Sequence, residues 1–376
     1  MPSTVRGQHT IQPPMSNLAW LDSLSPWPRD GFGVERMQAL LAELGDPQDA
    51  YPAIHVVGTN GKSTATITIE QLLLADGLSV GATISPHVAG WSERIRVDGA
   101  EVDFEEAVAR VRPTAERLDA TQFEIVTAAA LTAFAEDGVD AAVVEAGLGG
   151  RLDATNVLRT RVALLTNVAL EHTDVLGDSV EAIAREKLAV APADGVVVLP
   201  DRTFEHLVPP DSAVVIGGAH EAAEAFAGHA LERRPTPALP GRLERRESEV
   251  RDGAHNPDGV RYLVEQLRGS EPQTDFTIVV SILADKDADQ MLRELRRVGS
   301  RLVATRSSSE RALPAEDVAE LARAHFDHVE AIESPLEAVA RAHVLGQPVL
   351  VTGSLYLVGD LAQGERQRER RAACRR

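Results

Sequence analysis

The segment His55-Val-Val-Gly-Thr-Asn-Gly-Lys-Ser-Thr64 is the strongest indication of the fold in this sequence. An apolar run, residues 54–57, ends in a glycine turn, and a helix-compatible run then extends from Lys62 to Ala75. Glycine lets backbone N–H groups face an anion, the helix N-terminus adds partial positive charge, and a lysine can reach a terminal phosphate. The stretch therefore predicts a phosphate-binding loop. A plain surface turn is the alternative, because Val56 stands where the general pattern has a glycine.

Apolar runs alternate with amphipathic runs through the rest of the first half of the chain. This alternation predicts an α/β fold with a mostly parallel sheet and helices on both faces, in which ligands bind beyond the carboxyl ends of the strands. The expected strands are residues 53–57, 80–84, 141–145, 162–166, 196–199 and 214–216, and the expected helices include 104–118, 123–135 and 179–190.

A second α/β unit is expected after residues 235–249, which hold three prolines and a dense charge run and are interpreted as a linker. We therefore predict two domains, residues 15–243 and 250–362, with disorder in residues 1–14 and in the arginine-rich segment 363–376. In the second unit, strands are expected at 276–281, 302–305 and 348–352, and helices at 258–267, 288–297, 315–324 and 335–342.

The composition excludes several classes of protein. The net charge is −19, and the acidic residues are spread along the chain, which disfavours nucleic-acid and anionic-membrane partners. Apolar runs fall short of the ~20 residues of a membrane span, and residues 1–14 lack the apolar core of a secretory signal. Cys374 is the single cysteine, so an intrachain disulfide and a cysteine metal cluster are excluded, as expected of a cytoplasmic protein.

The most informative polar segment is Glu145-Ala-Gly-Leu-Gly-Gly-Arg-Leu-Asp-Ala-Thr-Asn156. Glu145 ends an apolar strand, where an ionised carboxylate is costly unless it is paired or bound to a metal ion. The glycines that follow permit close backbone approach to a ligand, which Arg151 and Asp153 can then hold. A structural role for Arg151 is an equal alternative.

Other candidates also follow predicted strands. Ser85-Pro86-His87 is by itself an ordinary turn, and His172 can supply one Mg²⁺ ligand beside Glu145. Lys187 lies on an expected helix, where composition alone predicts a solvated side chain.

In the second unit, Asp252 can accept hydrogen bonds from ribose hydroxyls, and His255 can contact an anionic substrate. Simple helix capping is the alternative for this turn.

Together these segments resemble the folylpolyglutamate synthase and dihydrofolate synthase family, within the Mur ligase superfamily. The resemblance runs from about Trp20 to Asp360. The matching segments are Gly-Val-Glu-Arg at 33–36, Gly-Thr-Asn-Gly-Lys-Ser at 58–63, Ser-Pro-His at 85–87, Phe-Glu with Thr at 123–127, Glu145 to Asn156, His-Thr-Asp-Val-Leu-Gly at 172–177, Glu-Lys at 186–187, Leu-Pro-Gly-Arg at 239–242, Asp-Gly-Ala-His-Asn-Pro at 252–257, Asp-Lys-Asp at 285–287 and Thr-Gly-Ser-Leu-Tyr at 352–356.

The resemblance implies a P-loop domain of the Mur ligase central type followed by a smaller Rossmann-like domain, with ATP and two Mg²⁺ ions as cofactors. The implied ATP-binding residues are Gly58, Thr59, Asn60, Gly61, Lys62, Ser63, Thr64, Arg242 and Asp252. The implied metal ligands are Ser63, Ser85, Glu145, His172 and Lys187, the last as a carbamate. The implied catalytic residues are Lys62, Lys187 and His255, and those of the pterin pocket are Phe123, Glu124, Leu152, Asp153, Ala154 and Thr155.

Three departures from the family pattern stand out. The loop reads Gly-Lys-Ser-Thr where the family usually has Gly-Lys-Gly-Ser, which leaves open which hydroxyl is the ligand. The segment after Lys187 reads Leu-Ala-Val in place of Ala-Gly-Ile, and the stretch 187–242 is shorter than usual. Glu221 is the nearest counterpart of the asparagine that contacts adenine in the family.

The resemblance implies ATP-dependent ligation of L-glutamate, through an acyl phosphate, to dihydropteroate, to a reduced folate, or to both. The bifunctional enzyme is our expectation, acting as a cytoplasmic monomer on small molecules. The alternatives are a Mur-like amide ligase for a different carboxylate and an inactive nucleotide-binding regulatory homologue.

Overall fold

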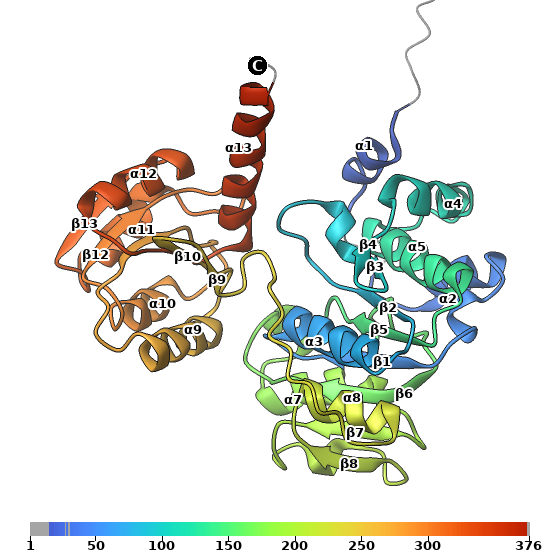
Figure 1. Cartoon of the computed structure of the whole chain (residues 1–376). Helices are drawn as coiled ribbons and strands as arrows, with labels where there is room; N and C mark the ends of the chain where they lie inside the picture. The colour runs from blue at the N-terminus through green and yellow to red at the C-terminus, as the bar shows by residue number, and fades with distance from the viewer. Residues whose placement is uncertain (1–14, 27, 29–30, 374–376) are drawn as a thin grey trace, which may run out of the picture.

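The computed structural model describes residues 15–26, 28 and 31–373, and builds them around two sheets that lie side by side (Figure 1). The predicted disorder of residues 1–14 falls outside the described residues. No helix of the described ranges combines the length and apolarity of a membrane span.

The first sheet has eight strands in the order β4-β3-β2-β5-β1-β6-β7-β8. Its strands are β1 (Ala53–Val57), β2 (Val80–Thr83), β3 (Ile95–Val97), β4 (Ala100–Glu101), β5 (Ala141–Glu145), β6 (Thr160–Leu165), β7 (Val196–Leu199) and β8 (Ala213–Ile216). All neighbours pair in parallel except β2 with β3 and β3 with β4. Because β1 pairs with β5 and β6, its carboxyl end lies between theirs, at the centre of the sheet.

Both faces of this sheet are covered, which is why β1 and β5 are buried along their whole length. Alternate residues of β5 point to opposite layers: Ala141 and Val143 pack with α3 and α8, whereas Ala142 and Val144 pack with α2, α4 and α5. The helices of this domain are α1 (Asn17–Asp22), α2 (Glu35–Glu43), α3 (Lys62–Ala75), α4 (Phe104–Arg117), α5 (Gln122–Asp137), α6 (Thr173–Leu176), α7 (Val180–Lys187) and α8 (Ala219–Ala227), with 3₁₀ turns η1 (Pro47–Asp49), η2 (Trp91–Arg94), η3 (Leu188–Val190) and η4 (Glu205–Leu207).

The second sheet has six strands in the order β13-β12-β11-β14-β10-β9, parallel except for β9. Helices α9, α10 and α11 cover one face, and α12 and α13 the other. The bounds are β9 (Glu244–Arg245), β10 (Glu249–Arg251), α9 (Pro257–Ser270), β11 (Thr277–Val280), α10 (Ala288–Leu295), β12 (Arg301–Ala304), α11 (Ala315–Ala322), β13 (His328–Ala331), α12 (Pro335–Leu345), β14 (Val349–Thr352) and α13 (Leu355–Ala373).

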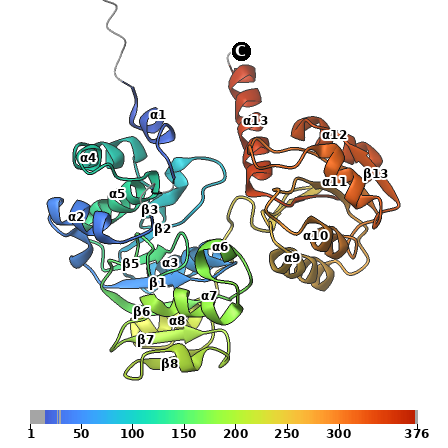
Figure 2. The same ribbon diagram turned by 180° about the vertical axis from the view of Figure 1, so that it is seen from behind.

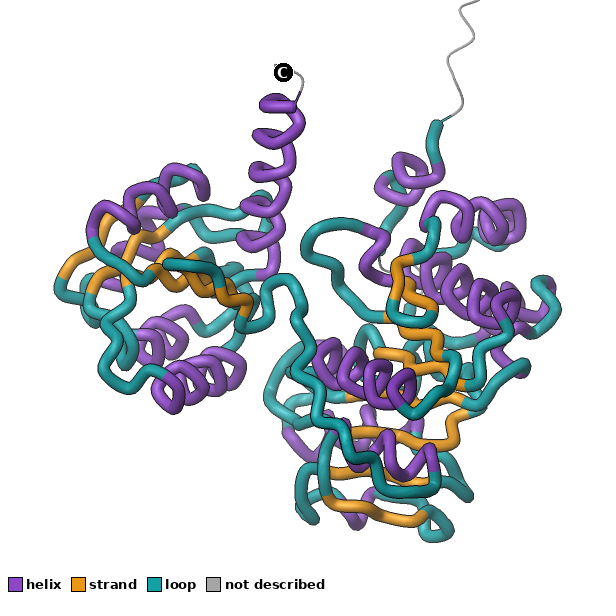
Figure 3. Tube along the Cα trace, viewed as in Figure 1, coloured by secondary structure: helices purple, strands orange, loops and turns teal. Residues whose placement is uncertain are grey.

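A loop without helix or strand joins α8 to β9 and runs alongside the first domain to the second (Figure 3). The prediction of a linker over 235–249 extends too far, because β9 begins at Glu244 and β10 at Glu249. Seen from behind, α6 lies on the side of the first domain that faces the second (Figure 2). The turn preceding it, after β6, is therefore placed between the two domains.

The predicted disorder of residues 363–376 is wrong for residues 363–373, which continue α13. The first turns of α13 are anchored by buried Leu357 and Leu361. Further along, Glu365 accepts hydrogen bonds from Arg251 at 2.6 Å and from Arg246 at 3.0 Å. These ion pairs tie α13 to the second sheet, whereas composition alone predicted a solvated tail here.

Candidate active site

The loop after β1 has the backbone of an anion cradle. Gly58 has φ +151° and Gly61 has φ +81°, and Gly61 directly precedes α3. A Cβ at Gly58 would overlap Thr166, so the close approach of β6 requires glycine there. The loop is held by the end of β6, where Asn167 accepts from the Asn60 amide at 2.8 Å and Thr166 donates to the Asn60 carbonyl at 2.7 Å.

Two lysines converge on this loop. The Lys62 Nζ atom donates to the carbonyls of Gly58 at 3.1 Å and Thr59 at 3.3 Å. The Lys187 Nζ atom donates to the same Gly58 carbonyl at 2.8 Å. Composition predicted a solvated Lys187, but the side chain is 4% exposed. Its burial, followed by the charge of Lys62, lowers the pKa of Lys187 to about 7. The loop thus presents positive charge from two side chains and a helix N-terminus.

Glu145 ends β5 beside the loop and is buried. One carboxylate oxygen accepts from the Ser63 hydroxyl at 3.2 Å, and the other accepts from the Ser85 amide at 3.0 Å. Burial raises the pKa of this carboxyl, and the charge of Lys62 opposes the increase. Residues from β5, α3 and the turn after β2 therefore meet around one buried carboxylate, which a cation would neutralise.

This donor set fits a nucleotide-bound Mg²⁺ better than a site made of protein ligands alone. Mg²⁺ typically takes one or two carboxylates and completes its shell with phosphate oxygens and water. Glu145 and the Ser63 hydroxyl match that pattern, and among the described residues no three His, Cys, Asp or Glu side chains gather to hold an ion by themselves. Burial lowers the pKa of His172, which keeps its imidazole in the neutral form that a metal ligand needs.

A cavity of about 590 Å³ opens beside Glu145, where it shares Ser85 with the acidic site. Its walls come from both domains. They include Phe123, Leu152 and Asp153 of the first domain and His255, Lys286 and Tyr356 of the second.

The predicted pterin residues divide into those on the cavity wall and those behind it. Phe123, Leu152 and Asp153 line the cavity with Ala154, whereas Thr155 is only 1% exposed and lies behind Asp153. Asp153 is held by backbone amides, accepting from Leu148 at 2.7 Å and from Thr155 at 3.0 Å.

Glu124 lies at the cavity edge, but its carboxylate is already engaged. It accepts from the Arg36 Nε atom at 2.9 Å, from the Thr121 amide at 2.7 Å and from the Thr121 hydroxyl at 2.8 Å. The pair with Thr121 is a capping box at the start of α5. The observed contacts therefore give Glu124 a structural task at the pocket wall.

The two domains meet through charged side chains at the cavity. Glu171, in the turn before α6, lies 3.0 Å from the Lys286 Nζ atom and 3.4 Å from the His255 Nε2 atom. Burial would raise the pKa of Glu171, but the hydrogen bond and charge of His255, and then those of Lys286, hold it below its usual range. His255 donates from Nδ1 to the Gly253 carbonyl at 2.8 Å, which fixes its ring.

A reciprocal amide pair also joins the P-loop to the second domain. Asn60 donates to the Asn256 side-chain oxygen at 3.3 Å, and Asn256 donates back at 3.1 Å. Asn256 also caps α9 by accepting from the Gly259 amide at 2.8 Å. Asn256 was not among the predicted site residues; its position before a helix-opening proline was the available signal.

Arg242 and Asp252 lie on the two segments that flank β9 and β10. Asp252 is buried and accepts from the amides of Leu243 and Ala254, both at 2.8 Å. Its pKa is raised by burial against the effects of the Leu243 hydrogen bond and of Arg242. These contacts hold the two loops together, and ribose binding by Asp252 stays a prediction.

Comparisons with known proteins identify the family of this chain. The Mur ligase middle domain model matches residues 56–205, and the Mur ligase glutamate ligase domain model matches residues 241–355. Dihydrofolate synthase/folylpolyglutamate synthase of Mycobacterium tuberculosis is 31% identical to this chain, over 85% of the chain and 84% of that protein. The chain belongs to the folylpolyglutamate synthase and dihydrofolate synthase family of Mur ligases.

Solved structures of this family share the whole architecture. Escherichia coli FolC in complex with DHPP and ADP has a TM-score of 0.84 and 25% identity, and the match covers 94% of this chain and 99% of that one. The Yersinia pestis bifunctional enzyme complexed with AMPPNP and Mn ion has a TM-score of 0.83 and 28% identity, over 94% and 100% of the two chains. The predicted family and the two-domain α/β fold are confirmed.

One departure from the family pattern has a local structural explanation. Glu221, the counterpart of the adenine-contacting asparagine, accepts from the Gly218 amide at 2.7 Å. This bond caps α8. It is also the largest of the effects that hold the pKa of Glu221 below its usual value. Glu221 therefore has a structural task in the shortened segment, as the cap of α8.

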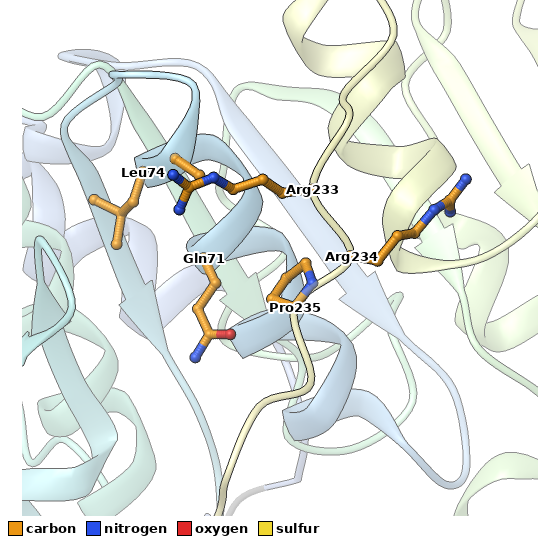
Figure 4. A pocket seen from close by; sticks show the side chains of 6 residues that line it. Gln71, Leu74, Arg233, Arg234 and Pro235 are labelled. Carbon is orange, nitrogen blue, oxygen red and sulfur yellow. The ribbon is translucent and has the colours of Figure 1, made fainter.

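A second hollow lies away from the cavity, between α3 and the loop that joins the domains (Figure 4). It is lined by Gln71 and Leu74 of α3 and by Arg233, Arg234 and Pro235 of the loop. Arg233 extends toward Leu74, whereas Arg234 points away from α3. None of the predicted site residues lines it.

Proposed function

We propose that this protein ligates L-glutamate to the carboxylate of a pterin substrate, with ATP as phosphoryl donor and through an acyl phosphate. The observation that carries the proposal is the shared wall between the buried Glu145 site and the 590 Å³ cavity, which meet at Ser85. That contact brings a phosphate-binding loop next to a pocket with an aromatic wall at Phe123. The Escherichia coli relative, whose structure holds DHPP and ADP, supports the same pairing of ligands.

The residues of the first domain suit the binding of ATP. Gly58 to Thr64 would surround the phosphates, and Lys62 would leave its present carbonyl partners to contact the terminal phosphate. Ser63, Ser85, Glu145 and His172 would hold Mg²⁺, for which we propose two ions. Bound Mg²⁺ polarises the phosphoryl oxygens and neutralises charge in the transition state.

The reaction asks mainly for position and charge from the chain. An oxygen of the substrate carboxylate attacks the γ-phosphorus, the bond to the β-phosphate oxygen breaks, and ADP leaves. The amine of L-glutamate then attacks the acyl carbon and expels phosphate, losing a proton as the amide forms. Lys62 and Arg242 would stabilise the charge on the transferring group, and His255 faces the cavity from the second domain.

Lys187 suits the carbamate that the family resemblance implies. A carbamate forms from a neutral amine, and the pKa of about 7 leaves a large neutral fraction of Lys187 near neutral pH. Its amine lies 2.8 Å from the Gly58 carbonyl, at the base of the P-loop. Carbamylation would replace this buried amine with an anionic oxygen ligand for Mg²⁺.

We further propose that both dihydropteroate and reduced folates are acceptors, and that the enzyme works as a cytoplasmic monomer. The test measures L-glutamate-dependent ADP release with dihydropteroate and with tetrahydrofolate supplied separately. The expected result is turnover with each acceptor. Turnover with one acceptor would refute bifunctionality, and turnover with neither would refute the folate assignment and favour a Mur-like ligase for another carboxylate.

A further inference from the structure

His55 is a buried histidine that the proposed reaction leaves without a task. It lies in the middle of β1, fully buried between Ile54 and Val56, which are also fully buried. Its Nε2 atom lies 2.8 Å from the Thr155 hydroxyl oxygen, and its Nδ1 atom has no hydrogen-bond partner among the described residues. Burying a polar ring inside an apolar strand costs free energy, which the single hydrogen bond to Thr155 offsets only in part.

The bond continues into the cavity wall. The Thr155 hydroxyl donates to the Asp153 carboxylate at 2.5 Å, and Asp153 lines the cavity. A hydroxyl has one proton to donate. Because that proton is given to Asp153, the hydroxyl must accept from His55, which therefore carries its proton on Nε2. Burial lowers the pKa of His55 to about 3, so the ring is neutral at physiological pH.

Asp153 is thereby held by three donors on its inner side. The amides of Leu148 and Thr155 fix its two oxygens, and the Thr155 hydroxyl adds a third bond to the oxygen that the Thr155 amide contacts. The two oxygens of a carboxylate offer about four acceptor positions, so one remains, on the oxygen that accepts from the Leu148 amide. A pterin ring presents its amino group and a ring N–H on one edge, and this position can accept from one of these donors.

We propose that His55 is a positioning residue, which acts through Thr155 to hold Asp153 in place as the acceptor for the N–H edge of the pterin ring. The inference rests on the proposed function, since the pterin is its substrate. His55 touches no substrate, and its effect passes through one hydroxyl.

The first test compares three variants of the full chain by steady-state kinetics. His55→Leu removes the donor and is expected to raise the KM for dihydropteroate about tenfold, the effect of one hydrogen bond of ordinary strength, with the KM for ATP changed less than twofold. His55→Gln carries an amide donor at the reach of Nε2 and is expected to restore the KM to within threefold of the wild-type value.

Tyr51→Phe is the matched control. Tyr51 is 1% exposed, precedes the same strand, and donates to the Leu131 carbonyl at 2.8 Å away from the cavity. Loss of the Tyr51 hydroxyl is expected to lower the melting temperature and to leave the KM values for dihydropteroate and ATP unchanged. An equal rise of both KM values in His55→Leu, or an unchanged KM for dihydropteroate, would overturn the inference.

A double-mutant cycle tests the route through Thr155. Thr155→Val is expected to raise the KM for dihydropteroate at least as much as His55→Leu, and the double variant is expected to match Thr155→Val alone. Additive effects would refute the chain His55–Thr155–Asp153. Wild-type enzyme without turnover on dihydropteroate would instead refute the proposed function, so the two failures are distinguishable.

A measurement without catalysis remains informative even where His55→Leu fails to fold. In ¹⁵N-histidine-labelled full-length protein, the His55 signal, assigned by its absence in His55→Gln, is expected to show the neutral Nε2–H tautomer throughout pH 6–8. A signal that titrates in this range, or one that shows the Nδ1–H tautomer, would refute the proposed direction of the bonds.

Discussion

Lys286→Met is expected to weaken the docking of the second domain on the first, and we call the docked arrangement of this structure the closed state. The Lys286 and Glu171 side chains are each 10% exposed, and their charged atoms lie 3.0 Å apart across the domain junction. Removing the ammonium leaves Glu171 in the closed state with His255, at 3.4 Å, as its remaining partner. When the domains separate, Glu171 regains water, so the loss falls on the closed state rather than on the fold of either domain.

The magnitude follows from the kind of bond. A hydrogen bond to a charged group contributes about 1.5–3 kcal/mol. If the whole of this free energy is lost from the closed state, the equilibrium constant for closure decreases by about 10- to 150-fold. If closure assembles the site for the amine, kcat/KM for L-glutamate should fall by the same factor.

The assay combines kinetics with small-angle scattering. The radius of gyration with a non-hydrolysable ATP analogue should be larger for Lys286→Met than for the wild type, and Lys286→Arg should retain most of the closure. The Glu171→Gln/Lys286→Met double variant should recover part of the activity, because no uncompensated carboxylate remains. Asp327→Asn breaks the exposed Arg296–Asp327 pair of the second domain and should change kcat/KM less than twofold.

Two results would refute this reasoning. One is a Lys286→Met enzyme whose kcat/KM for L-glutamate stays within twofold of wild type. The other is a lower melting temperature in Lys286→Met that accounts for the whole loss, because the pair would then stabilise the fold and not closure.

Three further predictions concern the loop and the core. Lys62→Ala should decrease glutamate-dependent ADP release by at least about 100-fold, because the phosphoryl group loses a partly buried cation, and near-normal turnover would remove the loop from the mechanism. Lys187→Ala should lose activity, and short-chain carboxylates should restore it; full activity without them would contradict a carbamate. In the wild type, bicarbonate should activate more at pH 8 than at pH 6, because the Lys187 amine is neutral above its pKa of about 7. Gly81→Ala would place a Cβ against the ring of fully buried Phe134 and should lower the free energy of unfolding, measured in urea, by about 1–3 kcal/mol. A Phe134→Leu substitution in the same chain should recover part of this loss. An unchanged urea midpoint in Gly81→Ala would contradict the prediction.

The elements that sequence reasoning predicted correctly depend on local patterns. The five residues of β1 and of β5 were predicted with their observed bounds, because a mainly apolar run between a turn and a glycine favours a buried strand. The positions of Glu145 and Ser85 near the loop followed from topology, since parallel strands end at the same edge of a sheet.

The misses share a different cause. β10 begins at Glu249, which the charge run assigned to the end of the predicted linker. The side chains of Glu249 and Arg251 are nevertheless buried and paired with each other. Their compensation comes partly from Glu365 on α13, more than a hundred residues later, and the same contacts order the helix that composition assigned to a disordered tail.

The alternation of apolar and amphipathic runs along the chain was sufficient to predict the layered α/β architecture and the strand–loop–helix unit around Gly58, because both depend on neighbouring residues. The order of the motifs carried the resemblance to the family. The partners of the buried polar groups came from folding alone: His55 with Thr155, Asn60 with Asn256, and Glu171 with Lys286. These pairs span 100, 196 and 115 residues. A buried donor or charge is satisfied by whichever group folding brings within about 3 Å, and no local pattern encodes that distance.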